Sequence, residues 1–192
     1  MDAFLLSFAV IFVAELGDKS QLMALAFATR YRAVDVLIGI SVATLVVHLG
    51  SVVVGSVVAT ALPTELIAVL AGVAFFIFAG WTLRGDKLDA EEASRAQRTT
   101  GSIILAVGVA FFLAELGDKT MLATITLATR EEPVGTWLGS TLGMVAADAI
   151  AIAVGKFLGS RLPERAIRYG AAAAFAIFGA LLIAQGLGFL GA

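Results

Sequence analysis

The sequence predicts an all-α integral membrane protein with six transmembrane helices, arranged as two inverted three-helix repeats, 1–100 and 101–192. Hydrophobic residues make up 60% of the 192 residues and charged residues only 15%, against roughly 25% in average soluble proteins. Six apolar stretches each reach the length of about 20 residues that a helix needs to cross the hydrocarbon of a bilayer. The second half of the chain also repeats the first.

The predicted spans are separated by segments rich in charge or proline. They cover roughly residues 3–29, 35–60, 64–83, 101–129, 134–159 and 166–190. The longest hydrophilic connection follows the third span, so we expect a first repeat at 1–83, a linker at 84–100 and a second repeat at 101–192. The N-terminus, MDAFLLSF, has no basic region and no small-residue cleavage site, which indicates a retained helix rather than a signal peptide.

Composition also limits the partners and cofactors that we expect. The net charge is −2 and no basic patch is present, so nothing indicates binding to nucleic acid. The chain has no cysteine, which excludes disulfides and thiolate metal sites. We predict no bound cofactor, and expect a lipid bilayer and a small ion as the partners. A homodimer is one assembly that the sequence allows.

A shift of 100 residues places the sequence on itself. FVAELGDKSQLMALAFATR at 12–30 meets FLAELGDKTMLATITLATR at 112–130, with 11 of 19 positions identical. A unit of three spans begins on one side of the membrane and ends on the other, so the second copy must enter the bilayer in the opposite orientation. This is the inverted-repeat plan of many secondary transporters.

Basic residues in short loops predict which side of the membrane each end faces. One predicted face carries Arg30, Arg32, Arg84, Lys87, Arg95, Arg98, Arg161, Arg165 and Arg168, whereas the other has Arg130 alone. We therefore expect a multi-pass protein of the cell inner membrane, with both termini outside and the loop 84–98 in the cytoplasm.

Each repeat carries the same charged hexapeptide in the middle of its first span, ELGDKS at 15–20 and ELGDKT at 115–120. Positions i and i+3 share a helix face, so Glu15 should project with Asp18, and Glu115 with Asp118. If the first spans are neighbours at the pseudo-two-fold axis, four carboxylates converge near the midplane. Each charge there costs about 2.5–3.5 kcal/mol, which argues for a function rather than packing.

The glycine between the two acids has two interpretations. Gly17 and Gly117 either allow close helix approach or mark a local break that frees backbone carbonyls. Two other interpretations of the hexapeptides stay open, namely a loop between two short helices and a structural polar zipper between the repeats.

The chemistry of these side chains favours a hard divalent cation. Mn²⁺ and Ca²⁺ prefer shells made of oxygen, whereas zinc and copper sites usually recruit His or Cys. The predicted ligands are Glu15, Asp18, Glu115 and Asp118, with the hydroxyls of Ser20 and Thr120. Crowded carboxylates favour protonation of some members, so protons and the cation should compete for the same oxygens.

Five further polar residues are assigned to a proton path or to support of the ligands: Lys19, Lys119, Gln21, His48 and Asp148. Each lysine follows a motif glutamate at i+4 and should neutralise part of the acidic cluster, or else act as a gate or as a mimic of the bound ion. Asp148 and His48 occupy equivalent positions in the second helix of each repeat, and the alternative for His48 is a hydrogen-bonded packing residue. Gln21 is matched by Met121, so it would serve one half-site only.

The two E-x-G-D-[KR]-[ST] motifs, one in each repeat, resemble the family of manganese and calcium transporters that includes the MneA-type bacterial manganese exporters and the Golgi calcium/manganese–proton antiporters. The likeness covers essentially the entire chain. It implies export of a divalent cation from the cytoplasm in exchange for protons, no enzymatic activity, and a cation site made by the motif acids Glu15, Asp18, Glu115 and Asp118.

Alternative functions remain open at this stage. The scaffold could export another small solute with proton coupling, act as a metal-dependent intramembrane enzyme, or form a passive channel. The sequence also does not choose between Mn²⁺ and Ca²⁺, since both take oxygen ligands and the size of the cavity decides between them.

Overall fold

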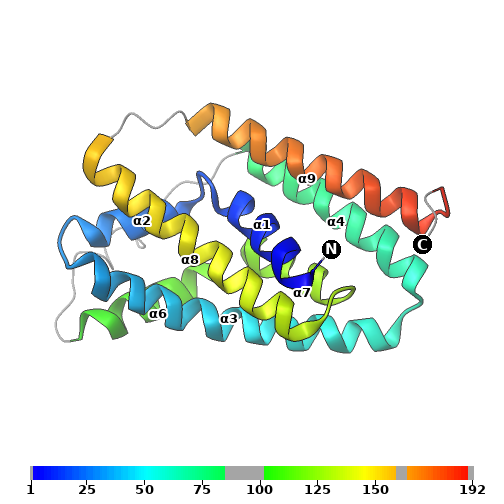
Figure 1. Ribbon diagram of the computed structural model, residues 1–192, viewed down its shortest axis with the longest axis horizontal. Helices are drawn as coiled ribbons and strands as arrows, with labels where there is room; N and C mark the ends of the chain where they lie inside the picture. Colours follow the sequence, from blue (N-terminus) through cyan, green and yellow to red (C-terminus); the bar gives the residue numbers. More distant parts are fainter. Residues whose placement is uncertain (1, 85–101, 159–163, 190–192) are drawn as a thin grey trace.

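The computed structural model describes residues 2–84, 102–158 and 164–189, and the regular secondary structure within those ranges is helical (Figure 1). The helices are α1 (Ala3–Glu15), α2 (Lys19–Ala28), α3 (Ala33–Ala61), α4 (Thr64–Arg84), α6 (Ile103–Glu115), α7 (Lys119–Ala128), α8 (Pro133–Leu158) and α9 (Glu164–Gly186). The all-α class is therefore confirmed. Beyond Arg84, the predicted linker 84–100 and its loop 84–98 lie outside the described residues, as does Arg161.

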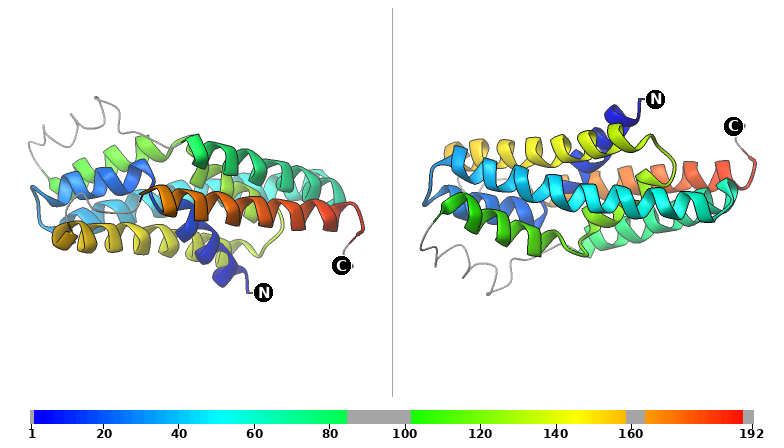
Figure 2. Two further views of the ribbon diagram at one scale, coloured as in Figure 1. Left: turned by 90° about the horizontal axis from the view of Figure 1, so that it is seen from above. Right: turned by 90° about the horizontal axis from the view of Figure 1, so that it is seen from below.

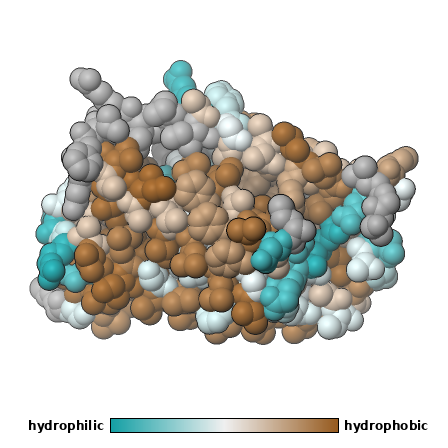
Figure 3. Space-filling model, in the orientation of Figure 1, coloured by the Kyte–Doolittle hydropathy of each residue, from teal (hydrophilic) through white to brown (hydrophobic). Residues whose placement is uncertain are grey.

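Four of these helices have the length and composition of membrane spans. The qualifying segments are Ala33–Ala61, Thr64–Arg84, Pro133–Gly155 and Arg168–Gly186, in α3, α4, α8 and α9. Side chains such as Val46, Val53 and Val57 on α3 are exposed, as lipid-facing residues should be. Figure 3 shows a largely hydrophobic face with hydrophilic residues toward its two ends. The chain is a multi-pass membrane protein.

The first span predicted for each repeat is not one continuous helix, which corrects the prediction for 3–29 and 101–129. α1 and α6 each have 13 residues, and α2 and α7 each have 10. At 1.5 Å per residue, 13 residues reach only about 20 Å, short of the roughly 30 Å of hydrocarbon. Only the two short helices in succession have the length of a span.

The interruption is a β-turn formed by the first four residues of each hexapeptide. Leu16 has φ −62° and ψ 117°, Gly17 has φ 77°, and the Asp18 N–H donates to the Glu15 carbonyl at 3.1 Å. These values fit a type II β-turn, whose third residue needs a positive φ and is therefore usually glycine. Leu116, Gly117 and Asp118 repeat the geometry, with φ 80° at the glycine. We call residues 16–18 the first break and residues 116–118 the second break.

Helices of one repeat pack mainly against helices of the other repeat (Figures 1 and 2). α1 packs along α8 and α6 packs along α3, while α4 runs beside α9 and α3 contacts α8. A Cβ on Gly39 would lie 2.8 Å from the Ile104 carbonyl oxygen, and one on Gly139 would lie 3.0 Å from the Phe4 Cα. These equivalent glycines allow the close crossings. As a result, the helix that ends at each break lies against the long helix of the other repeat.

The connections gather at two ends of the bundle. In Figure 1 the α2–α3 connection and the beginning of α6 lie at one end, whereas the α3–α4 connection and the C-terminus lie at the other. The two breaks lie between these ends, where α1 meets α2 and α6 meets α7. The four motif acids are buried there, whereas Gly17, Leu116 and Gly117 of the same hexapeptides are exposed.

Candidate functional site

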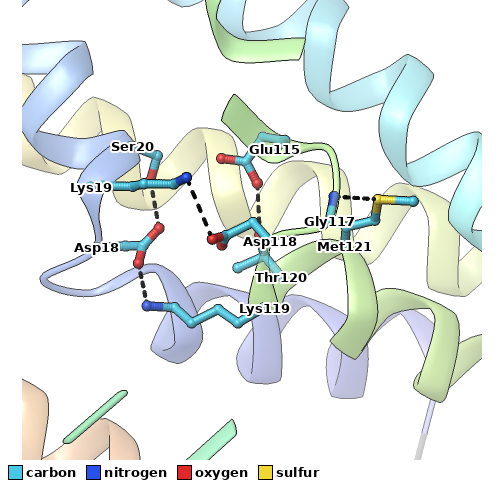
Figure 4. A network of polar contacts seen from close by, with 9 residues as sticks. All are labelled: Asp18, Lys19, Ser20, Glu115, Gly117, Asp118, Lys119, Thr120 and Met121. Carbon is cyan, nitrogen blue, oxygen red and sulfur yellow. Dashed lines mark hydrogen bonds and ion pairs between the residues drawn. The ribbon is translucent and has the colours of Figure 1, made fainter. Parts of the chain in front are cut away.

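The two breaks meet through ion pairs that cross between the repeats (Figure 4). The Lys119 ammonium donates to Asp18 Oδ1, and the Lys19 Nζ lies 3.8 Å from Asp118 Oδ1. The side chains of Asp18 and Lys119 are 0% and 2% exposed. The structure thus brings the hexapeptides of the two halves together and joins each to the other by its lysine.

The turn explains why Asp18 can face the other repeat. Asp18 precedes the first residue of α2, and its extended backbone (φ −81°, ψ 166°) lies outside the helical region. One carboxylate oxygen accepts from Lys119, and the other accepts from the Ser20 hydroxyl at 3.3 Å. The helix N-terminus beside it carries a partial positive charge, which further favours an acid at this position.

The positions of the two motif glutamates are less favourable for a negative charge than that of Asp18. Glu15 and Glu115 are the last residues of α1 and α6, where the helix dipole disfavours a negative charge, and no basic residue lies in either last turn. Among the described residues, neither carboxylate oxygen of Glu15 has a hydrogen-bond partner. Glu115 Oε2 accepts from the Thr120 hydroxyl at 2.7 Å, and its Oε1 has no partner in the same ranges. Buried acids in this condition need a proton or a cation.

Two predictions about side-chain pairing within a repeat are wrong. Glu15 and Asp18 do not share a helix face, because α1 ends at Glu15 and the turn intervenes. The expected i, i+4 pairs of Glu15 with Lys19 and of Glu115 with Lys119 fail for the same reason. Each lysine instead reaches the aspartate of the opposite repeat.

The acids nevertheless form one electrostatic cluster. Asp18, Glu115, Asp148 and Lys119 all lie close enough to Glu15 for their charges to interact. Within the described ranges, no three His, Asp or Glu side chains are grouped so that they could hold a metal ion together. In this arrangement the acids of the two breaks are held partly by lysines, and they do not form a ready-made cation cage.

The two equivalent polar residues of the long helices differ in position. Asp148 on α8 is fully buried and interacts electrostatically with Asp18. Its carboxylate oxygens, and both ring nitrogens of His48 on α3, have no hydrogen-bond partner in the described parts of the chain. The structure brings Asp148 to the acidic cluster, whereas His48 makes no hydrogen bond to either hexapeptide.

Several contacts were not anticipated from the sequence. The Gln21 amide donates to the Ala147 carbonyl on α8, and the Met121 sulfur accepts from the Gly117 N–H. The exchange of lysine partners between the repeats was also missed. A lysine directly after the aspartate in both copies was the available signal, but its partner depends on which helices are neighbours.

Comparison with known proteins gives this geometry its context. The family described as divalent cation/proton antiporter GDT1 matches residues 3–90 and 103–188, which include both breaks. The chain belongs to the GDT1 family. Members of the GDT1 family are cation transporters and not enzymes, so the intramembrane enzyme considered above is excluded.

Relatives within the GDT1 family extend from bacteria to plants. An inferred manganese exporter of Vibrio cholerae serotype O1 is 36% identical over 171 residues, which are 88% of this chain and 84% of the relative. A GDT1-like protein of Synechocystis is 32% identical over 186 residues, 87% of this chain and 89% of the relative. The chloroplastic PAM71-homolog of Arabidopsis thaliana is 30% identical over 207 residues, and the match spans 58% of its length. No solved structure matches the chain.

Proposed function

We propose that this chain exports a divalent cation, Mn²⁺ or Ca²⁺, from the cytoplasm in exchange for protons, through the acidic cluster at the two breaks. The observation that carries the proposal is the crossed pairing of Asp18 with Lys119 and of Asp118 with Lys19 inside the bundle. Membership of the family supports divalent cation export, and the relative named as an inferred manganese exporter favours Mn²⁺.

The proposed ligands are the four motif acids with two hydroxyls: Glu15, Asp18, Glu115, Asp118, Ser20 and Thr120. Four ionised carboxylates beside two ammonium groups carry a net charge of −2, which one divalent cation balances. Without the cation, the lysines hold the aspartates. For the cation to take those oxygens, the ammonium groups of Lys19 and Lys119 must withdraw, so both lysines act as internal counter-ions.

Protons supply the reverse step in this proposal. Oxygens that bind the cation when ionised lose it when protonated, so external protons displace the ion. Asp148 is buried and interacts electrostatically with Asp18, and we assign it to the proton path. His48 and Gln21 are assigned to support of the site from α3 and α2.

The membrane arrangement belongs to the same proposal. We infer six spans in two inverted repeats, with α1–α2 and α6–α7 each forming one interrupted span. Discontinuous helices near the midplane are common in secondary transporters because their ends present dipoles and free carbonyls to the substrate. The distribution of basic residues supports an orientation with both termini outside the inner membrane.

Ion flux in proteoliposomes tests the proposal. Protein is reconstituted with a Mn²⁺ indicator and a pH indicator inside the vesicles, and Mn²⁺, Ca²⁺ and Mg²⁺ are added in turn outside. We expect Mn²⁺ entry to release protons, and Glu15→Gln and Glu115→Gln each to lower the rate at least about tenfold, the scale of one lost charged interaction. Glu65→Gln, the same change at an exposed acid on α4, should leave the rate unchanged.

The outcomes separate the competing functions. Absence of flux for every cation, or equal flux in the Glu15 and Glu115 variants, would remove the cation site. Flux without proton movement would leave a passive channel. Proton movement that responds to a different solute but not to the cation would indicate a solute exporter.

A further inference from the structure

The side chain of Gln21 connects the first break to α8. Gln21 Oε1 accepts from the Gly17 N–H at 2.8 Å, and Gln21 Nε2 donates to the Ala147 carbonyl at 3.0 Å. Gly17 is the residue with positive φ at the centre of the turn. One amide therefore links the interrupted backbone of the first repeat to the long helix of the second.

Among the described residues, no side chain links the Gly117 N–H to α3 in the way that Gln21 links the Gly17 N–H to α8. Met121 occupies the matching position, and its sulfur accepts from the Gly117 N–H at 3.2 Å (Figure 4). A thioether has no hydrogen to donate and is a weak acceptor. Gln21 donates a second hydrogen bond to the Ala147 carbonyl of α8. Met121 cannot donate the equivalent bond to the carbonyl of Val47, which is the matching residue on α3.

The position of the tether on α8 matters for the acids. Ala147 directly precedes Asp148, which is fully buried and interacts electrostatically with Asp18 of the first break. We call Glu15, Asp18 and Ser20 the first half-site, and Glu115, Asp118 and Thr120 the second half-site. Asp148 interacts electrostatically with Glu15 and Asp18 of the first half-site and with Glu115 of the second, whereas the equivalent residue on α3, His48, supplies no acid. The tether therefore sets the placement of the first half-site relative to Asp148.

We infer that Gln21 is a positioning residue that holds the first half-site against α8 beside Asp148. The first half-site is then the fixed part of the cation site, and the second half-site is the adjustable part. This inference rests on the proposed function. Held ligands lose less freedom when a cation binds, so the tether should act on affinity rather than on the maximal rate.

The first test replaces Gln21 by the residue that the second repeat carries. Gln21→Met keeps the side-chain length and removes the donor to Ala147. Loss of a hydrogen bond of ordinary strength corresponds to about 3- to 10-fold, so we expect KM for Mn²⁺ to rise by that factor. The maximal rate should stay within about twofold of wild type. Gln185→Met, the same chemical change on α9 where Gln185 accepts from Arg130 at 2.7 Å, should leave KM unchanged.

The second test moves the amide to the other break. In Gln21→Met combined with Met121→Gln, the amide stands beside α3 and His48 rather than beside α8 and Asp148. We expect KM to remain raised, because the first half-site is still untethered. Recovery of the wild-type KM would show that either break can carry the tether, and would overturn the assignment of the first half-site as the fixed part.

A third measurement uses the unmodified protein and does not depend on whether the variants fold. Amide hydrogen exchange in lipid nanodiscs should be slower at Gly17 than at Gly117, because an amide oxygen at 2.8 Å holds the N–H better than a sulfur at 3.2 Å. Equal exchange would contradict the tether. Absence of both Mn²⁺ and Ca²⁺ flux in wild type would refute the proposed function, whereas wild-type Mn²⁺ flux with an unchanged KM in Gln21→Met would refute only this inference.

Discussion

Lys119 and Asp18 form a buried ion pair although they lie 101 residues apart in the sequence and belong to different repeats. The equivalent pair, Lys19 with Asp118, is longer at 3.8 Å, and the Lys19 side chain is 21% exposed. Two nearly identical hexapeptides thus meet in two unequal ways. A transporter that exposes its site to one side at a time requires such inequality between its halves.

This inequality predicts different effects on stability. Lys119→Met removes the ammonium group that donates to the buried Asp18 carboxylate, at a cost of about 3–5 kcal/mol. Lys19→Met removes a longer pair in which the lysine is partly exposed, so its cost should be smaller, although Asp118 is also buried. Thermal unfolding in detergent, followed by tryptophan fluorescence, should show the larger fall in Tm for Lys119→Met. Adding Asp18→Asn to that variant should recover most of the loss, and equal shifts in the two single variants would contradict the difference in burial.

The turn at each break predicts a strong dependence on glycine. An alanine Cβ at Gly117 would meet no atom within 4 Å, so any cost of Gly117→Ala comes from its φ of 80°. The left-handed conformation costs a residue with a Cβ about 1–2 kcal/mol. Gly80→Ala on α4 also meets no atom within 4 Å, and in a helix it should stabilise by about 0.5–1 kcal/mol. Opposite signs of the Tm shift are expected, and a stabilised Gly117→Ala would mean that the break is absent in the membrane.

Replacing Asp148 should affect transport differently from replacing a cation ligand. We expect Asp148→Asn to retain Mn²⁺–Mn²⁺ exchange across the vesicle membrane but to lose accumulation driven by a pH gradient, because the side chain can no longer carry a proton. His48, at the equivalent position on α3, does not belong to the acidic cluster, so His48→Asn should affect accumulation much less. Loss of both activities in Asp148→Asn would place Asp148 among the ligands instead.

The absence of cysteine allows a clean test of orientation. Thr126 lines a cavity of about 360 Å³ together with Arg130 and Gln185, at the end of α7 that the proposed orientation puts outside. A single cysteine in Thr126→Cys should therefore react with a membrane-impermeant thiol reagent added to intact cells. Ala123→Cys lies one turn earlier on the same helix at a fully buried position and should stay unlabelled. Labelling of Thr126→Cys only in inverted vesicles would reverse the predicted orientation.

Much of the fold could be read from the pattern of apolar residues. The long runs that became α3, α4, α8 and α9 were predicted close to their observed bounds, since length and hydropathy alone decide whether a helix can span a bilayer. The first span of each repeat was harder. Its overall hydropathy favours one helix, whereas the Leu-Gly pair at 16–17 encodes a local turn, and the local signal prevailed.

The sequence by itself determined that the chain is a duplicated, membrane-embedded helical unit, and it marked the acids, the glycine and the lysine of each hexapeptide as the unusual residues. Those properties depend on composition and spacing, which a linear pattern carries in full. Only the tertiary structure decided that Lys119 forms its ion pair with Asp18 and that Gln21 hydrogen-bonds to α8. It also decided that Asp148 lies in the acidic cluster and that His48 does not. These pairings follow from α1 packing on α8 and α6 on α3, and contacts between residues about 100 positions apart are set by which helices are neighbours.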